Sequence, residues 1–458
     1  MARQLSALIM AAGQGTRMRS RLPKVLHRVC GRAMVDWVVT AARTAGAEDV
    51  ICVTRPGDGV AEAAPAAVEI VEQRDGEGTG AAVLAARAEL QRADVVVVLS
   101  GDHPLVSPTL VADLVAAHER ERAAATLLTT DQLDPAGYGR IVRAADGSVD
   151  RIVETKVTEG VPASELAIRE INIGLYAFDA AQLLEALDSV DETGGERYLT
   201  AAFEVLRQRG HKVAAHRTDD TLSAMGVNTR ADLVAVTRAA QRRILADHAR
   251  AGVTFTSPDS VQVDVDVEIG EDTTVWGGVT LVGSTRVGRG CDVGPNTTIT
   301  DSLLGDDVTV PHSFLVQCRV ADGATVGPFA YLRPQADVGA QAKAGTFVEI
   351  KNSTIGTGAK VPHLSYIGDA DVGAGANLGA GSITANYDGR TKHRTVIGRD
   401  ARTGVHTSFV APVRVGDRAY TGAGSVITQD VPEGALGIER APQKNIEGYA
   451  DRKTRQTE

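Results

Sequence analysis

The first half of the chain alternates short apolar runs with longer stretches of helical periodicity. The runs at 6–10, 49–54 and 93–100 are almost wholly apolar, and helical spacing of apolar residues follows at 33–46 and 79–90. Apolar strands separated by helices are typical of a parallel sheet that is covered on both faces. The pattern therefore predicts an α/β domain over residues 1–229, whose ligands bind beyond the carboxyl ends of the strands.

The second half follows a different pattern. Residues 230–250 lack glycine and proline and predict one linking helix; from about 261 to 430 an aliphatic residue followed by glycine then recurs. Many spacings are multiples of six, and Ile269-Gly270 precedes Val287-Gly288 by eighteen residues. A hexapeptide period with one inward aliphatic residue predicts a parallel β-helix, here over 251–458, with three repeats in each coil. The period breaks at "NYDGRTKHRT", 386–395, which predicts an extruded loop.

Composition narrows the classes of partner. The net charge of −10 argues against a nucleic-acid partner but leaves small anionic substrates open. No run approaches the about 20 apolar residues of a membrane span, and the short N-terminal run is unlike a signal peptide, so we expect a cytoplasmic protein. The scattered cysteines are predicted to be buried free thiols: Cys30, Cys52, Cys291 and Cys318.

A glycine pair ends the first apolar run, in "AAGQGTRM". The third glycine of a dinucleotide-binding fingerprint is missing after Gly13 and Gly15, and so is the lysine-serine or lysine-threonine pair of a P-loop. Bare backbone amides followed by Arg17 and Lys24 suit a triphosphate. On these residues alone, a tight surface turn with incidental cations is an equally good interpretation.

Longer motifs carry a family resemblance. "AAGQGTRMRSRLPKVLH" resembles the signature of sugar-1-phosphate nucleotidyltransferases, especially N-acetylglucosamine-1-phosphate uridyltransferases. "VPHLSYIGDADVGAGANLGAGSITANYDG" resembles the acetyltransferase half of the same bifunctional enzymes, and the resemblance covers nearly the whole chain. It implies a Rossmann-like nucleotidyltransferase domain followed by a left-handed parallel β-helix that forms homotrimers. It also implies synthesis of UDP-N-acetylglucosamine, a precursor of the cell wall, from glucosamine-1-phosphate, acetyl-CoA and UTP.

For the first half, the resemblance implies transfer of uridylyl from UTP to N-acetylglucosamine-1-phosphate, with release of pyrophosphate. Arg17 and Lys24 match cations that neutralise charge, and Asp102 and Asn228 match the pair that holds Mg²⁺. The uracil-reading stretch is matched by Gln73, Gly78 and Thr79, and the sugar contacts by Gly139, Glu154 and Asn172. Taken singly, Asp102 could instead be a helix cap, Gly139 a turn and Asn172 a loop stabiliser.

For the second half, histidine suits removal of the proton from an attacking amine near neutral pH. The resemblance implies that His363 is this base for the 2-amino group of glucosamine-1-phosphate. It implies that three cations bind the sugar phosphate: Arg333, Lys351 and Lys392. The substrate-positioning residues are matched by Tyr366, Asn377, Asn386 and Tyr387, and the acetyl-CoA contacts by Ala380, Val405, Ala423 and Arg440.

The chain also departs from the family pattern. Gln, His, Thr and Asp are usual in the family at the positions of Gly76, Ala81, Ile173 and Ala201. These losses of polar groups predict looser sugar selectivity. Val405-His406 stands where the family has Ser-Asp, which predicts weaker acetyl-CoA binding or slower transfer.

Two alternatives remain at this stage. In one, the chain is a nucleotidyltransferase for the same or a related sugar phosphate, and a weakened or inactive β-helix serves only as a trimerisation scaffold; the change at Val405 favours this. In the other, it binds a UDP-sugar without turnover, which retention of Arg17, Lys24, Asp102 and Asn228 disfavours.

Overall fold

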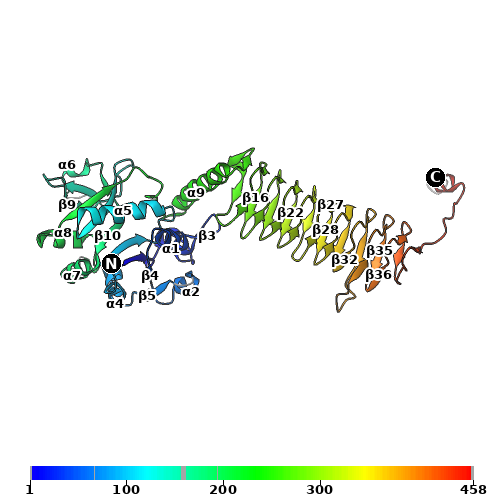
Figure 1. Ribbon diagram of the computed structural model, residues 1–458, viewed down its shortest axis with the longest axis horizontal. Helices are drawn as coiled ribbons and strands as arrows, with labels where there is room; N and C mark the ends of the chain where they lie inside the picture. Colours follow the sequence, from blue (N-terminus) through cyan, green and yellow to red (C-terminus); the bar gives the residue numbers. More distant parts are fainter. Residues whose placement is uncertain (1–2, 66–67, 156–160, 193, 455–458) are drawn as a thin grey trace. The chain divides into compact units, whose positions relative to one another are not determined.

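A computed structural model describes residues 3–65, 68–155, 161–192 and 194–454. The chain divides into two compact units, Met1–Arg242 (unit 1) and Arg243–Glu458 (unit 2). Unit 1 is an α/β unit, whereas unit 2 consists of stacked coils of short strands (Figure 1). Each unit is described by itself.

Unit 1 is built on one sheet. Its strand order is β11 (Val213–Arg217), β7 (Ala125–Thr130), β10 (Ile171–Asp179), β6 (Val95–Ser100), β1 (Leu5–Met10), β4 (Asp49–Thr54) and β5 (Glu69–Glu72), and β8 (Arg140–Arg143) and β9 (Val149–Val153) extend it beside β10. Strand β10 runs antiparallel to β6 and β7, so the sheet is mixed rather than wholly parallel. The difference arises because an apolar run specifies burial on both faces but not the direction of the strand.

Helices cover both faces of this sheet, as predicted. In strand β1, Leu8 packs into one apolar cluster while its neighbours Ala7 and Ile9 pack into the other. The first cluster includes residues of α3 (Thr79–Ala85), α7 (Ala180–Asp188) and α8 (Ala201–Gln208), and the second includes residues of α1 (Met34–Thr44) and α5 (Pro108–Glu121). The helix expected over 79–90 is interrupted at Ala86, after which α4 (Arg87–Leu90) follows. Unit 1 also contains the short helices α2 (Val60–Ala63) and α6 (Ala163–Leu166) and the strand pair β2 (Arg28–Val29) and β3 (Arg32–Ala33).

The arrangement of strands β1 and β6 determines where a ligand can bind. The two strands are parallel neighbours, and Met10 at the end of one is paired with Ser100 at the end of the other. The glycine turn and the segment around Asp102 therefore leave the sheet at the same edge. Parallel α/β sheets bind ligands at this edge.

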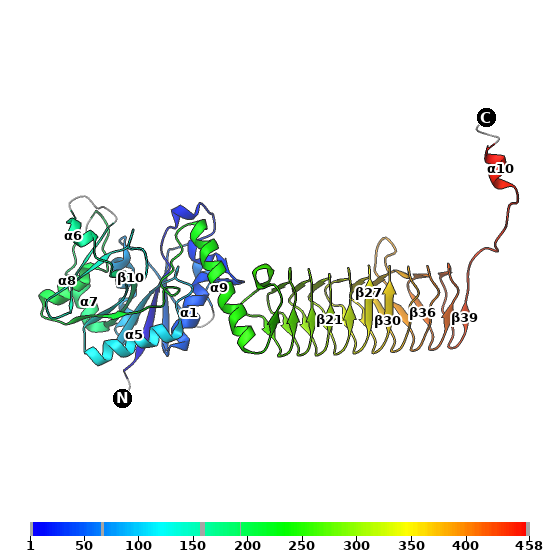
Figure 2. The same ribbon diagram turned by 90° about the horizontal axis from the view of Figure 1, so that it is seen from above.

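Unit 2 is a parallel β-helix with three sheets (Figure 2). The first runs from β12 (Thr254–Phe255) to β30 (Lys360–His363), the second from β13 (Gln262–Val263) to β38 (Val426–Ile427), and the third from β14 (Glu268–Ile269) to β36 (Val413–Val415). Ile269 is paired with Val287, one coil of eighteen residues later, as the period predicts. Both side chains are buried, so the stacked aliphatic residues form the core of the solenoid.

One coil of the β-helix is longer than its neighbours. Strand β32 (Ala370–Val372) pairs with β34 (Thr395–Ile397), and Ala370 is the partner of Thr395, twenty-five residues later. The extra residues form the predicted loop, which is closed by a bridge between Tyr387 and Lys392. The loop is visible as an excursion from the coils in Figure 2.

Helix α9 (Arg230–Arg250) contains the boundary between the units. Among the described residues, none of the helices combines the length and apolar character that crossing a bilayer requires. All four cysteines are buried thiols outside any disulfide, as predicted.

Two candidate active sites

The first candidate site is a cavity of about 460 Å³ in unit 1, at the carboxyl ends of β1 and β6. Its lining includes much of the predicted uridylyl site: Arg17, Lys24, Gln73, Gly78, Thr79, Asp102 and Asn228. These residues are far apart in the sequence, and the sheet edge brings them together.

The glycine turn places Lys24 in this cavity. Gly15 has a φ of 61°, and a Cβ atom there would lie 2.7 Å from Cβ of Lys24. Only glycine therefore lets the turn approach the lysine so closely without strain. The short helices Thr16–Met18 and Lys24–Leu26 follow and direct Arg17 and Lys24 to the cavity.

Asp102 is the buried anion of the site. It forms an ion pair with Lys24, and it accepts hydrogen bonds from Ser100 Oγ at 2.7 Å and from His103 Nδ1 at 2.8 Å. Burial raises the pKa of this carboxyl group, but the hydrogen bonds and charges of His103 and Lys24 outweigh burial and hold the pKa well below its usual range. Asp102 is therefore a carboxylate at neutral pH.

Asn228 reaches the cavity from the start of helix α9. The backbone N–H groups of Asn228 and Thr229 donate to Asp232 at 2.9 and 2.8 Å, and Asp232 N–H donates back to Thr229 Oγ1 at 3.2 Å. This reciprocal cap fixes the helix start. The Asn228 amide oxygen then accepts from Arg17 Nη2 at 2.9 Å and lies 3.4 Å from Lys24 Nζ.

The three predicted sugar contacts form a group outside the lining of this cavity. Asn172 N–H donates to the backbone oxygen of Gly139 at 2.9 Å, and Asn172 Nδ2 donates to Tyr176 Oη at 2.9 Å. Glu154 accepts from Thr200 Oγ1 at 3.3 Å. Gly139 and Asn172 are thus brought together, and Glu154 comes from the neighbouring strand end.

The sequence reasoning missed Arg55, which also lines the cavity. Its Nε donates to the backbone oxygen of Ala12 at 2.5 Å, and its Nη2 pairs with Glu77 at 2.6 Å. Arg55 directly follows strand β4, the neighbour of β1. The rule that ligands bind at the carboxyl ends of strands could have identified it.

Two of the departures from the family pattern lie together. A Cβ atom on Gly76, whose φ is 74°, would be 3.1 Å from Cβ of Ala81. Ile173, by contrast, is buried in the apolar core beside Leu175, and Ala201 begins helix α8.

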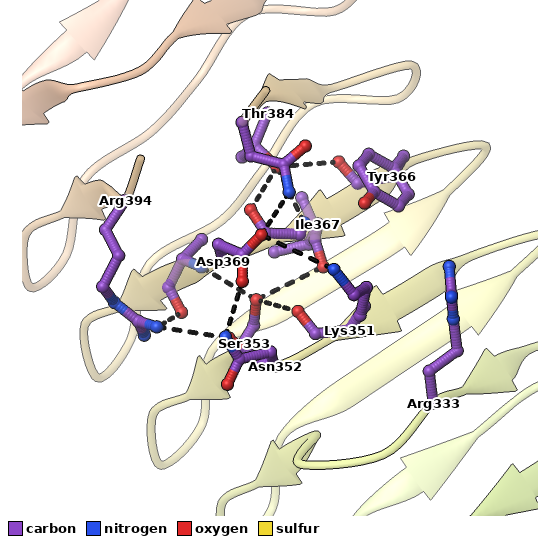
Figure 3. A network of polar contacts seen from close by, with 12 residues as sticks. Arg333, Lys351, Asn352, Ser353, Tyr366, Ile367, Asp369, Thr384 and Arg394 are labelled. Atoms are coloured by element: carbon purple, nitrogen blue, oxygen red, sulfur yellow. Dashed lines mark hydrogen bonds and ion pairs between the residues drawn. The ribbon is translucent and has the colours of Figure 1, made fainter. Parts of the chain in front are cut away.

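The second candidate site is a cluster of cations on unit 2. Arg333 and Lys351 stand eighteen residues apart on successive coils, and Lys392 comes from the extruded loop. Arg333 Nη1 donates to Glu349 at 2.8 Å. Lys351 Nζ lies 3.7 Å from Asp369 Oδ2 (Figure 3). The pKa of Lys392 is lowered, first by its side-chain contact with Lys351 and then by the charge of Lys351, whereas the charge of Asp369 acts to raise it. The two ammonium groups are therefore close neighbours.

Tyr366 and His363 flank the same corner of one coil. His363 ends strand β30 and is exposed, and Tyr366 begins strand β31 (Tyr366–Gly368). A Cβ atom on Gly368 would lie 2.6 Å from Cζ of Tyr366, so glycine lets the tyrosine ring lie against the backbone. Asn386 and Tyr387 begin the extruded loop, and Asn377 forms bridges to Lys360 and Arg402.

The predicted acetyl-CoA residues form a column across successive coils. His406 N–H donates to the backbone oxygen of Ala380 at 2.7 Å, and Arg440 Nη1 donates to the backbone oxygen of Ala423 at 3.0 Å. Val405 is 47% exposed on the coil between them. The structure thus brings these residues together, with an aliphatic side chain at the centre of the column.

Two family models match the chain. The MobA-like NTP transferase domain matches residues 7–217, and the bacterial transferase hexapeptide model, with six repeats, matches residues 266–301. The predicted fold class is confirmed: unit 1 is a Rossmann-like nucleotidyltransferase fold, and the parallel sheets of unit 2 are consistent with a left-handed hexapeptide β-helix.

Relatives match along almost the full length. Bifunctional protein GlmU of Mycolicibacterium vanbaalenii is 46% identical over 465 residues, which cover 98% of this chain and 94% of the relative. The protein of the same name from Mycolicibacterium gilvum is 47% identical, with coverage of 98% and 92%. That from Mycobacterium tuberculosis is 46% identical, also with coverage of 98% and 92%.

Proposed function

This chain belongs to the family of bifunctional GlmU proteins, and we propose on that basis that it makes UDP-N-acetylglucosamine in two steps. Unit 2 transfers an acetyl group from acetyl-CoA to glucosamine-1-phosphate. Unit 1 then transfers uridylyl from UTP to the N-acetylglucosamine-1-phosphate formed, and the product supplies peptidoglycan synthesis. The observation that carries this proposal is the convergence of Arg17, Lys24, Asp102 and Asn228 on one cavity.

In uridylyl transfer, a phosphate oxygen of the sugar attacks the α-phosphorus of UTP. The bond from this phosphorus to the bridging oxygen breaks, and pyrophosphate leaves. Negative charge gathers on the phosphoryl oxygens, so catalysis consists mainly of positioning and charge neutralisation. Arg17 and Lys24 supply positive charge, and the buried Asp102 keeps Lys24 directed at the cavity.

Mg²⁺ fits the donors present in this cavity. Among the described residues, no group of three or more His, Cys, Asp or Glu side chains could hold a metal by itself. Asp102 and Asn228 nevertheless offer a carboxylate and an amide oxygen that both face the Lys24 ammonium. Mg²⁺ commonly takes one or two protein oxygens together with phosphate and water. When bound by Asp102 and Asn228, it would neutralise phosphate charge.

In acetyl transfer, the amine nitrogen of glucosamine-1-phosphate attacks the thioester carbonyl, the carbon–sulfur bond breaks, and CoA leaves as the thiol. His363 accepts the amine proton. Arg333, Lys351 and Lys392 bind the sugar phosphate. Tyr366, Asn377, Asn386 and Tyr387 orient the sugar, and the column from Ala380 to Arg440 contacts acetyl-CoA.

The alternative of an inactive β-helix is tested by following both products. The purified chain is given glucosamine-1-phosphate and acetyl-CoA, and CoA thiol is measured. Pyrophosphate release from UTP and N-acetylglucosamine-1-phosphate is measured separately. We expect both activities, with thiol release lost in His363→Ala and pyrophosphate release retained. Release of pyrophosphate but not of thiol by the unmodified chain would establish the scaffold alternative. Release of neither product would refute both the bifunctional proposal and the scaffold alternative.

We further expect a homotrimer whose β-helices associate. Residues at one corner of successive coils form an exposed aromatic column. Phe329 and Phe347 are 54% and 59% exposed and their rings stack with centroids 5.3 Å apart. Both have a positive φ, which is unfavourable for bulky residues. Exposed apolar clusters mark interaction surfaces. Light scattering should give three times the chain mass, and a Phe329→Ser, Phe347→Ser double variant should give a lower mass.

The substrates also indicate where the protein acts. UTP and acetyl-CoA are cytoplasmic metabolites, and four buried thiols without a disulfide fit a reducing compartment. We therefore expect the activity in the cytoplasmic fraction of cells.

A further inference from the structure

One buried charge beside the cation cluster has no place in the mechanism above. Asp369 follows strand β31 at a corner of the coil, where its φ is 48°. It is only 4% exposed. Burying an unpaired carboxylate costs several kcal/mol, so its partners indicate what it does.

Amide groups from the two neighbouring coils hold the two oxygens of Asp369. Asn352 Nδ2 donates to Oδ1 at 2.5 Å (Figure 3). Asn386 Nδ2 donates to Oδ2. Each asparagine is seventeen residues from the aspartate. The three residues therefore form a column, one in each coil, with the charge in the middle.

Asp369 also balances the charge of the lysines. Lys351 Nζ lies 3.7 Å from Oδ2, the oxygen that also accepts from Asn386. The two neighbouring ammonium groups, Lys351 and Lys392, repel each other, and the carboxylate offsets that repulsion. Burial raises the pKa of Asp369, but the hydrogen bonds from the two asparagines and the charges of the lysines outweigh burial and lower it. Asp369 is therefore ionised at neutral pH.

Both ends of the extruded loop are attached to Asp369. Asn386 begins the loop and donates to the carboxylate, and Thr395 N–H, just past the loop, donates to the backbone oxygen of Asp369 at 3.1 Å. Within the loop, His393 N–H donates to the backbone oxygen of Asn386 at 2.8 Å. Asp369, which is not in the loop, therefore helps to anchor the segment that carries Lys392.

We propose that Asp369 is a positioning residue that holds Lys351 and the loop carrying Lys392 in the arrangement that binds the phosphate of the sugar substrate. The proposal rests on the acetyl-transfer function proposed above. It assigns Asp369 no contact with the substrate. Its effect should therefore be on the binding of the sugar phosphate, and it should act through Lys351 and through the loop that carries Lys392.

The test compares Asp369→Asn with Asp400→Asn. The first substitution removes the negative charge and puts an NH2 group in place of one of the two accepting oxygens. In place of Oδ1 it removes the bond from Asn352, and in place of Oδ2 it removes both the bond from Asn386 and the pairing with Lys351. We expect the KM for glucosamine-1-phosphate to rise about tenfold, with the KM for acetyl-CoA and pyrophosphate release unchanged. Asp400 is an exposed corner aspartate with a φ of 54°, and its variant should match the unmodified chain.

A cycle of variants separates positioning from a general structural effect. If Asp369 acts through the two lysines, Asp369→Asn should change the KM by less than twofold when Lys351→Ala and Lys392→Ala are already present. An equal rise in both backgrounds would overturn the proposal. An unchanged or lower KM in Asp369→Asn alone would also overturn the proposal. It would show that the negative charge of Asp369 does not help the site to bind phosphate.

Calorimetric titration with glucosamine-1-phosphate measures the same loss without turnover. Any binding in unit 1 is common to the variants and cancels in the comparison. If the chain showed no acetyl transfer, the proposed function of unit 2 would be refuted. The titration would still decide the role of Asp369: weaker binding of glucosamine-1-phosphate by Asp369→Asn supports that role, and equal binding overturns it.

Discussion

The two units each set a lysine that we propose to bind phosphate against a buried aspartate, but they assemble the pair differently. In unit 1, Lys24 and Asp102 are 78 residues apart and meet because strands β1 and β6 end at the same edge of the sheet. In unit 2, Lys351 and Asp369 are eighteen residues apart and meet because one coil stacks on the next. In the α/β unit, the order of the strands brings residues that are distant in the sequence into one site. In the solenoid, the regular stacking of the coils does so.

The difference has a consequence for mutation. Each coil of a solenoid contacts mainly its neighbours, so a change there affects a local set of residues. The site of unit 1 instead joins a glycine turn, a strand end and a helix start that are distant in the sequence. Removing one partner of a buried pair leaves an uncompensated charge in either unit.

The largest expected effect comes from breaking the pair in unit 1. Asp102→Asn keeps the shape of the side chain but removes the charge that directs Lys24 and could hold Mg²⁺. We expect pyrophosphate release to fall about 10³-fold, of the order seen when one electrostatic contact to a transition state is lost. Thiol release by unit 2 should stay unchanged and serves as the folding control. A loss below tenfold would contradict the role given to Asp102.

Acid should weaken unit 1 through His118. Burial lowers the pKa of His118 to about 4, against about 6.5 in an unfolded chain. Between these values the unfolded chain binds the proton and the folded one does not. The unfolding free energy is therefore highest above pH 6.5. It decreases by about 3 kcal/mol in total as the pH falls from there to below 4.

This effect can be measured by urea unfolding between pH 7 and pH 4. Trp37 reports on unit 1 by its fluorescence, provided that Trp276, the other tryptophan, is replaced by phenylalanine. His118→Gln should flatten the pH dependence relative to the parent. An equally steep dependence in the variant would show that other groups are responsible.

Two glycine substitutions should each lower the activity of one unit and spare that of the other. Gly15→Ala pushes Lys24 out of place, and Gly368→Ala pushes the Tyr366 ring off the backbone. We expect each to lower one activity about tenfold, pyrophosphate release for the first and thiol release for the second, and to leave the other within twofold. Each variant is the control for the other. Loss of both activities in either variant would contradict independent sites.

The smallest expected effect is a gain. Val405 is exposed within the column proposed for acetyl-CoA, and a serine there could donate a hydrogen bond that valine cannot. Val405→Ser should lower the KM for acetyl-CoA by a few-fold, about 1 kcal/mol for one neutral hydrogen bond. Val405→Ala, which removes bulk without adding a donor, is the matched control. An equal gain in both variants would show that the smaller side chain, and not an added hydrogen bond, causes the effect.

Much of this protein follows from the sequence by itself, because periodicity is a local property. Strand β4 has the predicted bounds 49–54, and the eighteen-residue spacing of Ile269 and Val287 is the spacing of paired strands. The break at 386–395 is the loop between successive coils. In a solenoid, counting along the chain also predicts which residues become neighbours, since each coil repeats the same path.

Only the tertiary structure decided the rest. The direction of β10, the interruption at Ala86 and the place of Arg55 in the cavity depend on packing between distant segments. The same is true of Asp369, which lies in the motif that resembles acetyltransferases but has no role implied by that resemblance. Its importance appears only when Asn352, Asn386 and the lysines are seen around one carboxylate, because the cost of burying a charge depends on its surroundings in space.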